Sequence, residues 1–107
     1  MDEDDVVRAL GALANPLRLK LFRLLVVAGK AGLTPGAITE AVGIASTTLS
    51  FHLKELSHAG LVSQERDGRY LIYRASFERM NGLLGYLTAN CCEGEICEVA
   101  ASPSCDC

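Results

Sequence analysis

Five cysteines give this chain its most distinctive chemistry, and all of them lie after residue 90. Their odd number argues against a framework of disulfide bonds. Thiolates bind soft metal ions and are also readily oxidised. Cysteines crowded into one terminal segment therefore predict a soft-metal site or a thiol redox site. The residues concerned are Cys91, Cys92, Cys97, Cys105 and Cys107.

The two histidines do not extend this chemistry. His52 falls beside the apolar face of its predicted helix, where we expect packing or capping instead of metal binding. His58 faces outward near the end of the same helix, where the partial negative charge of the helix end favours it. The chain shows no Ser-His-Asp or Cys-His arrangement, phosphate loop or paired carboxylates, so we expect no enzyme activity.

The charges are unevenly distributed along the chain. The net charge of the whole is −3, but eight of the thirteen acidic residues lie in the two ends. All ten Lys and Arg residues lie between residues 6 and 92 with only five acids, so this middle carries +5. A basic middle with acidic ends is compatible with binding a polyanion.

Length and hydropathy favour one small domain. A chain of 107 residues with 50% hydrophobic residues can bury one core, although the poor surface-to-volume ratio at this size favours a dimer. No apolar run reaches the roughly 18 residues needed to span a membrane. The sequence begins Met-Asp-Glu-Asp-Asp, unlike the basic start of a signal peptide. We therefore expect a cytoplasmic protein with no membrane partner.

Hydrophobic periodicity and capping residues predict a series of helices after a frayed acidic tail over residues 1–5. Asn15, Thr34, Ser46 and Ser76 are the expected N-caps. A loop is expected at residues 30–33. The predicted helices cover residues 4–14, 16–28, 35–42 and 46–58, with a last one after Ser76.

The segment after Gly60 has the alternation and composition of a β-hairpin. Residues 61–66 and 69–75 are the expected strands, and Asp67-Gly68 is the expected two-residue turn. The order helix, helix, short helix, turn, helix, hairpin is that of a winged helix-turn-helix. The predicted fold is therefore mainly α with a β-hairpin, a winged helix-turn-helix that forms a homodimer.

The helix over residues 46–58 has two distinct faces. At 100° per residue, Leu49, Leu53 and Leu56 share a sector about 60° wide that must pack inward. The opposite face and the N-terminal turn suit base edges and phosphates, and the hairpin tip suits phosphates or the minor groove. The alternatives are a solvated helix face and charges that protect an edge strand. The predicted DNA contacts are Ser46, Thr47, Thr48, Ser50, Phe51, Lys54, Arg66 and Arg69.

Three stretches resemble the arsenic-repressor family of winged-helix metalloregulators, also called ArsR/SmtB. They are ALGALANPLRLKLFRLL (9–25), LSFHLKELSHAGLV (49–62) and RDGRYLIY (66–73). The resemblance covers roughly residues 5–90. It implies a homodimeric repressor that binds operator DNA, an inverted repeat, and releases it when its ion binds. We expect the first and last helices to form the dimer interface through Val6, Val7, Leu10, Leu83, Leu84 and Leu87.

The resemblance also bears on the sensing site. Residues 36–40 contain no cysteine and residues 77–90 contain no His or Asp, so two site types of this family are absent. The family's subtype with a C-terminal Asn-Cys-Cys and a third cysteine is matched by Asn90-Cys91-Cys92 and Cys97. This subtype implies arsenite sensing, with trivalent arsenic or antimony as the inducer.

Thiol chemistry agrees, because trivalent arsenic forms three bonds to soft ligands and Gly94 lets the chain turn between Cys92 and Cys97. Zinc prefers four ligands, which Cys105 or Cys107 would complete, so zinc, cadmium and lead stay open. If the site does not hold zinc, we expect Cys105 and Cys107 to be accessory thiols. A thiol redox repressor and a non-DNA arsenic carrier are the remaining alternatives. The expected organisation is a DNA-binding and dimerisation domain over 1–90 and a metalloid-binding tail over 91–107.

Overall fold

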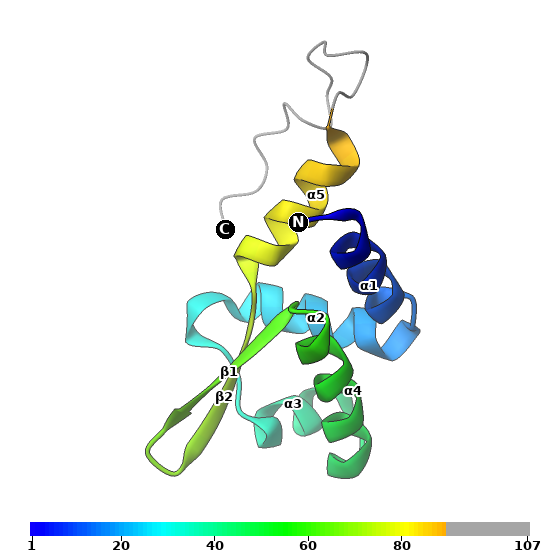
Figure 1. Cartoon of the computed structure of the whole chain (residues 1–107). Coiled ribbons are helices and arrows are strands. Elements are labelled where there is room, and N and C mark those ends of the chain that lie inside the picture. Colours follow the sequence, from blue (N-terminus) through cyan, green and yellow to red (C-terminus); the bar gives the residue numbers. More distant parts are fainter. Residues whose placement is uncertain (90–107) are drawn as a thin grey trace.

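The computed structural model describes residues 1–89, and this part of the chain forms a winged helix-turn-helix (Figure 1). The fold class expected from the sequence is confirmed. The two strands form an antiparallel hairpin. The elements are α1 (Glu3–Leu13), α2 (Pro16–Ala28), the 3-10 turn η1 (Gly29–Ala31), α3 (Pro35–Val42), α4 (Ser46–His58), β1 (Val62–Asp67), β2 (Tyr70–Ala75) and α5 (Phe77–Thr88).

Local capping sets where most helices begin. The side chain of Asn15 accepts hydrogen bonds from the backbone N–H groups of Leu17 and Arg18 at 3.0 and 3.1 Å. Thr34 and Ser76 cap α3 and α5 in the same way. These side chains satisfy N–H groups that have no partner inside the helix, so the predicted caps are confirmed.

Two predictions at helix starts are wrong. Residues 1–5 are not a frayed tail, because Asp2 and Asp5 form a reciprocal capping box and α1 begins at Glu3. Acidic side chains are favourable here, next to the positive end of the helix dipole. The N-cap of α4 is Ala45 and not Ser46, and no side chain caps this helix.

The hairpin turn lies one residue later than predicted. Asp67 pairs with Tyr70, so the central turn residues are Gly68 and Arg69 instead of Asp67 and Gly68. Gly68 has a φ of 65°, which glycine adopts without steric cost. Glycine at the first central position therefore determines the turn, and Arg69 lies at its tip.

The base of the hairpin is anchored to the loop before α3. Leu33 and Tyr73 exchange two backbone hydrogen bonds of 2.9 and 2.8 Å, which adds a short bridge to the hairpin. Gly32 lies so close to β2 that a Cβ there would be 2.6 Å from the carbonyl oxygen of Tyr73. This segment, predicted as a plain loop, therefore fixes the hairpin against the helical body.

The core lies between the helices and the base of the hairpin. It is built mainly from apolar side chains of α2 and α4, with smaller contributions from α1, α3, the hairpin and α5. α5 leaves the hairpin, passes α1 and projects away from the end that carries α3 and α4 (Figure 1). The described helices include none long and apolar enough to cross a membrane. The seven most deeply buried large side chains are Leu21, Leu25, Ile38, Leu49, Leu53, Leu56 and Leu61.

Candidate nucleic-acid interface

Helix α4, hereafter the recognition helix, separates an inner from an outer face. Leu49, Leu53 and Leu56 are buried in the core, as the periodicity predicts. All predicted contact residues on this helix are exposed, and the side chain of Phe51 is 56% exposed. The outer face thus offers small hydroxyl groups, one aromatic ring and one ammonium group. The exposed residues are Ser46, Thr47, Thr48, Ser50, Phe51 and Lys54.

The N-terminal turn of the recognition helix differs from those of the other α-helices of residues 1–89. Its N-cap is Ala45, which offers no side-chain acceptor, whereas the other four begin with a capping side chain. Its first backbone N–H groups therefore remain free to donate outward. The positive end of the helix dipole adds to this, so the turn is suited to an anionic oxygen such as that of a phosphate.

The hairpin tip lies at the same end of the molecule as the recognition helix, opposite α5 (Figure 1). Arg66 and Arg69 are both exposed, and Arg69 occupies the turn itself. Tyr70, which was not among the predicted contacts, follows Arg69 and has a side chain that is 62% exposed. An aromatic side chain at a two-residue turn was the available signal. The tip thus offers two guanidinium groups and a phenol to a polyanion.

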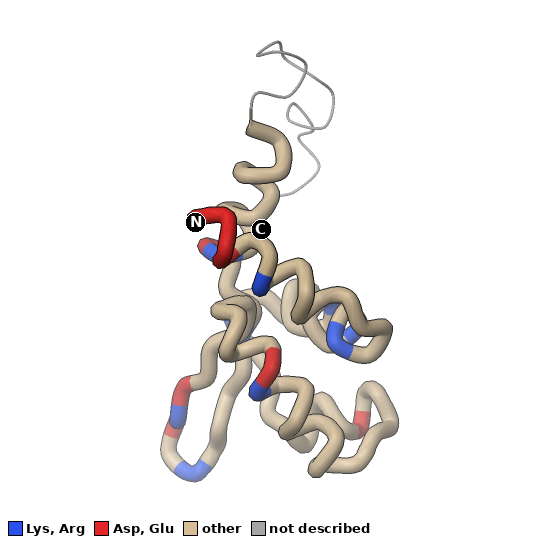
Figure 2. Tube along the Cα trace, turned by 45° about the vertical axis from the view of Figure 1, so that its right-hand side comes forward, with Lys and Arg blue, Asp and Glu red and all other residues tan. Residues whose placement is uncertain are grey.

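Acidic and basic residues are mixed on the hairpin, where Glu65 and Asp67 flank Arg66 (Figure 2). The acidic first turn of α1 lies at the end away from the hairpin tip. Further basic residues lie on α2. A polyanion that approaches the recognition helix and the hairpin therefore avoids the acidic turn.

The recognition helix is tied to the start of α2 through His52. Arg18 donates from Nε to the carbonyl oxygen of Ala12 at 2.7 Å, and its Nη1 lies 3.4 Å from Nδ1 of His52. A guanidinium has no acceptor, so the imidazole accepts through Nδ1. The ring also makes an edge contact with Phe51 at 5.1 Å between centroids. The side chain thus packs between α2 and Phe51, as the sequence predicts.

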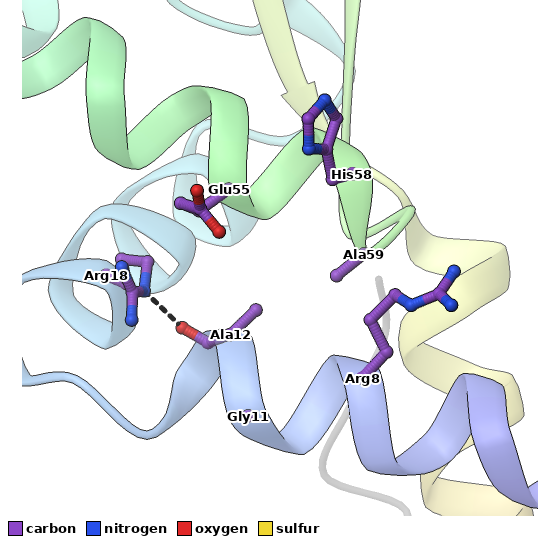
Figure 3. A pocket seen from close by; sticks show the side chains of 7 residues that line it. All are labelled: Arg8, Gly11, Ala12, Arg18, Glu55, His58 and Ala59. Atoms are coloured by element: carbon purple, nitrogen blue, oxygen red, sulfur yellow. Dashed lines mark hydrogen bonds between the residues drawn. The ribbon is translucent and has the colours of Figure 1, made fainter.

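His58 faces a polar pocket of about 380 Å³ between α1 and the end of the recognition helix (Figure 3). The side chains of Arg8, Arg18 and Glu55 also line it. This pocket lies at the opposite end of the recognition helix from Ser46. His58 therefore lies at the far end of the helix from the N-terminal turn that carries the predicted phosphate site.

The predicted dimer interface divides into buried and exposed residues. Val6 and Leu83 are only 3% and 6% exposed within one protomer, because they point into its own core. They therefore offer little surface to a partner. Val7 and Leu10 on α1 are exposed, as are Leu84 and Leu87 on α5. The interface stays a prediction, and these four side chains are the ones that can carry it.

The predicted metalloid ligands lie outside the described residues. This applies to Cys91, Cys92 and Cys97, and also to the accessory thiols Cys105 and Cys107. Within residues 1–89 no group of three or more His, Cys, Asp or Glu side chains is placed to hold a metal ion. Soft-ligand chemistry and spacing in the sequence therefore support these three thiols as ligands.

A family model described as a helix-turn-helix domain matches residues 13–65. A relative from Bacillus subtilis (strain 168), an uncharacterized HTH-type transcriptional regulator YceK, is 41% identical over 68 residues, which cover 62% of this chain and 67% of the relative. An arsenical resistance operon repressor from the same organism is 34% identical over 92 residues, covering 80% of this chain and 84% of the relative.

A solved structure extends this similarity to the fold. It is the homodimeric winged helix-turn-helix DNA-binding domain of Mb0332 from Mycobacterium bovis, a possible ArsR-family transcriptional regulator. Its TM-score is 0.65 at 33% sequence identity, and the match covers 86% of this chain and 85% of that one. The match to the family model includes the whole recognition helix and the first four residues of β1.

Proposed function

Because the chain belongs to the ArsR family of helix-turn-helix transcriptional regulators, we propose that it is a homodimeric repressor that releases operator DNA when trivalent arsenic or antimony binds its C-terminal cysteines. As a DNA-binding regulator of this family, the chain is not an enzyme, which confirms that expectation. The arsenic response and the residues that mediate it are the proposal.

The observation that carries the DNA-binding part is the recognition helix. Its uncapped N-terminal turn and its exposed hydroxyl face lie at the same end of the molecule as the hairpin tip. We assign base contacts to Thr47, Ser50 and Phe51, since small or flat side chains approach base edges closely. We assign phosphate contacts to the remaining predicted residues, which are Ser46, Thr48, Lys54, Arg66 and Arg69.

In this proposal the dimer interface is formed by the exposed aliphatic side chains of α1 and α5. Two copies related by a twofold axis would present two recognition helices to an inverted repeat, with half-sites about one helical turn, or a multiple, apart. The similar Mycobacterium bovis domain is homodimeric, which supports this arrangement. In this proposal residues 1–90 bind DNA and dimerise, and residues 91–107 sense the inducer.

The thiol set supports the choice of inducer. Cys91, Cys92 and Cys97 supply three soft ligands, the number that trivalent arsenic or antimony takes. The name of the similar Bacillus subtilis repressor, that of an arsenical resistance operon, points to the same element. Release of DNA then requires that arsenic bind the free dimer more tightly than the DNA-bound dimer, since equal affinity would shift nothing.

The test is an operator-binding titration of the reduced protein. An operator is first selected from a random duplex library, and binding is then followed by fluorescence anisotropy with and without arsenite. We expect tight binding to an inverted repeat, weaker binding to a single half-site, and release by arsenite or antimonite. Release by zinc, cadmium or lead alone, or by an oxidant alone, would contradict the proposed inducer. No sequence-specific affinity would contradict the repressor and favour an arsenic carrier.

A further inference from the structure

Arg79, in the first turn of α5, lies directly over Gly60, two residues after the last residue of the recognition helix. A Cβ built on Gly60 would be 2.7 Å from Nε and 2.8 Å from Nη2 of Arg79. Gly60 has a φ of 77° and donates to the carbonyl of Ser57 at 2.9 Å, while Leu61 donates to that of Leu56 at 3.0 Å. This pair of bonds is the Schellman closure of a helix. Glycine is thus needed both for the closure and for the approach of Arg79.

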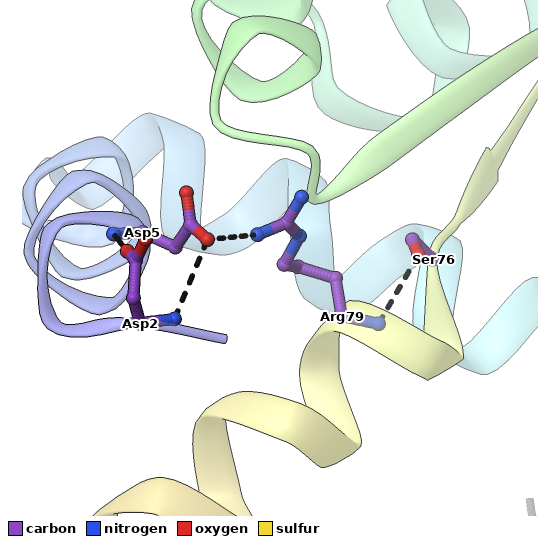
Figure 4. Close-up of polar contacts among 4 residues, drawn as sticks. All are labelled: Asp2, Asp5, Ser76 and Arg79. Atoms are coloured by element: carbon purple, nitrogen blue, oxygen red, sulfur yellow. Dashed lines mark hydrogen bonds and ion pairs between the residues drawn. The ribbon is translucent and has the colours of Figure 1, made fainter.

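The same guanidinium reaches helix α1 (Figure 4). Its Nη1 lies 3.7 Å from Oδ2 of Asp5, and both side chains are only about one-third exposed. Asp5 is itself held by Asp2, whose carboxylate accepts from the Asp5 backbone N–H at 2.8 Å. Arg79 therefore joins the first turn of α1 to the last turn of the recognition helix.

The start of α5 is fixed at the same place. The backbone N–H of Ser76 donates to the carbonyl of Leu61 at 2.8 Å, and the Ser76 hydroxyl accepts from the Arg79 backbone N–H at 3.2 Å. α5 has 12 residues, so it is about 18 Å long. Its other end, Thr88, lies two residues before Asn90 and the cysteines in the sequence. α5 is therefore fixed at its first turn, where Arg79 lies, and its other end precedes the cysteines in the sequence.

We propose that Arg79 is the positioning residue through which α5 sets the orientation of the recognition helix. A displacement at the far end of α5 turns its first turn about the link between Ser76 and Leu61. The guanidinium then moves away from Gly60 and Asp5. The end of the recognition helix is freed, and its outer face tilts relative to the DNA. The regulatory part of this inference rests on the proposed arsenite response.

The test compares Arg79→Ala, Arg79→Lys and the control Glu78→Gln, which changes an exposed residue of the same turn. Operator affinity, arsenite binding by thiol protection, and thermal unfolding are measured for each. The parent should lose 5- to 150-fold in operator affinity with arsenite, the usual range of such couplings. Arg79→Ala should bind operator more weakly from the start and lose less than about twofold with arsenite, while binding arsenite normally. Arg79→Lys, which keeps the charge, should restore part of the response.

Gly60→Ala is the second variant, because its methyl group would expel the guanidinium. It should reduce the arsenite response as Arg79→Ala does, and it should also lower thermal stability, because alanine is strained at a φ of 77°. A full arsenite response in Arg79→Ala would overturn the inference and leave the proposed function intact. If the parent itself does not respond, the proposed function fails. Unchanged operator affinity in Arg79→Ala would then overturn the positioning role as well.

Discussion

Arg74 and Glu65 form a diagonal ion pair across the hairpin, with Nη1 donating to Oε1 at 2.9 Å. The two residues are not opposite each other, because Arg74 faces Ser63 and Glu65 faces Ile72. Nε of Arg74 also donates to the carbonyl oxygen of Lys30 at 2.7 Å. One guanidinium therefore joins both strands to η1, and this fixes the direction in which the hairpin points.

Replacing Arg74 should affect DNA binding more than stability. Because Glu65 is well exposed, the ion pair contributes at most about 1 kcal/mol to folding. Arg74→Ala lets the hairpin change direction, so operator affinity should fall about tenfold, or about 1.4 kcal/mol. Glu65→Gln retains the bond to Lys30 and should have a smaller effect. Anisotropy and chemical denaturation measure the two quantities. Equal loss for both variants would show that the bond to Lys30 has no role.

Arg69 at the hairpin tip should contribute a phosphate contact. Arg69→Ala should weaken binding to all duplexes alike and reduce the slope of log affinity against log salt concentration by about one unit. Arg23→Ala, an exposed arginine on α2, is the matched control and should leave the slope unchanged. Titrations at several salt concentrations give both slopes. A slope unchanged in Arg69→Ala removes this residue from the interface.

Phe51 should contribute to sequence preference and not to general affinity. Its ring is exposed, so Phe51→Ala should alter the free energy of unfolding by less than about 0.5 kcal/mol. The preference for operator over random duplex should fall by about 1–3 kcal/mol, as for the loss of one base contact. Leu19→Ala, another exposed apolar residue, on α2, is the control. Competition binding checks this. An unchanged preference would show that Phe51 is only a surface residue.

The dimer should depend on the exposed side chains of α1 and α5. Leu87→Asp places a charge where the proposed interface excludes water, so it should convert the dimer to monomer and abolish binding to the inverted repeat. Val27→Asp, at a position 78% exposed on α2, should leave the dimer intact. Sedimentation equilibrium distinguishes the two outcomes. A Leu87→Asp dimer of parental stability would place the interface elsewhere.

The sequence predicts the helices well because their start signals are local. Asn15, Thr34 and Ser76 each bond to backbone N–H groups two or three residues away, so a short window contains the whole interaction. The burial of the leucines of the recognition helix is equally predictable, since their spacing matches the helical period. The predicted N-cap of the recognition helix, Ser46, is one residue too late. A serine hydroxyl near a helix start can either cap the helix or lie within its first turn.

The errors arise where distant parts of the chain meet. Leu33 bonds to Tyr73, and nothing near Leu33 indicates this partner. The one-residue shift of the hairpin turn depends on which residues of β2 pack on the helices, which periodicity alone does not determine. Arg79 over Gly60 is a contact of the same kind, and its only local signal is a glycine at a helix end. Val6 and Leu83 are buried between helices whose mutual orientation the sequence does not specify.

The three-thiol arsenite site is tested by arsenite-dependent release of operator DNA from serine variants of each cysteine. A serine hydroxyl keeps the volume of the thiol but is a hard, protonated ligand that cannot replace a thiolate. Cys91→Ser, Cys92→Ser and Cys97→Ser should each bind operator as the parent does and fail to release it with arsenite. Cys105→Ser and Cys107→Ser should respond normally. Release of Cys97→Ser at the parental arsenite concentration would contradict the three-thiol site and leave Cys91 and Cys92 as a two-thiol site for a methylated arsenical.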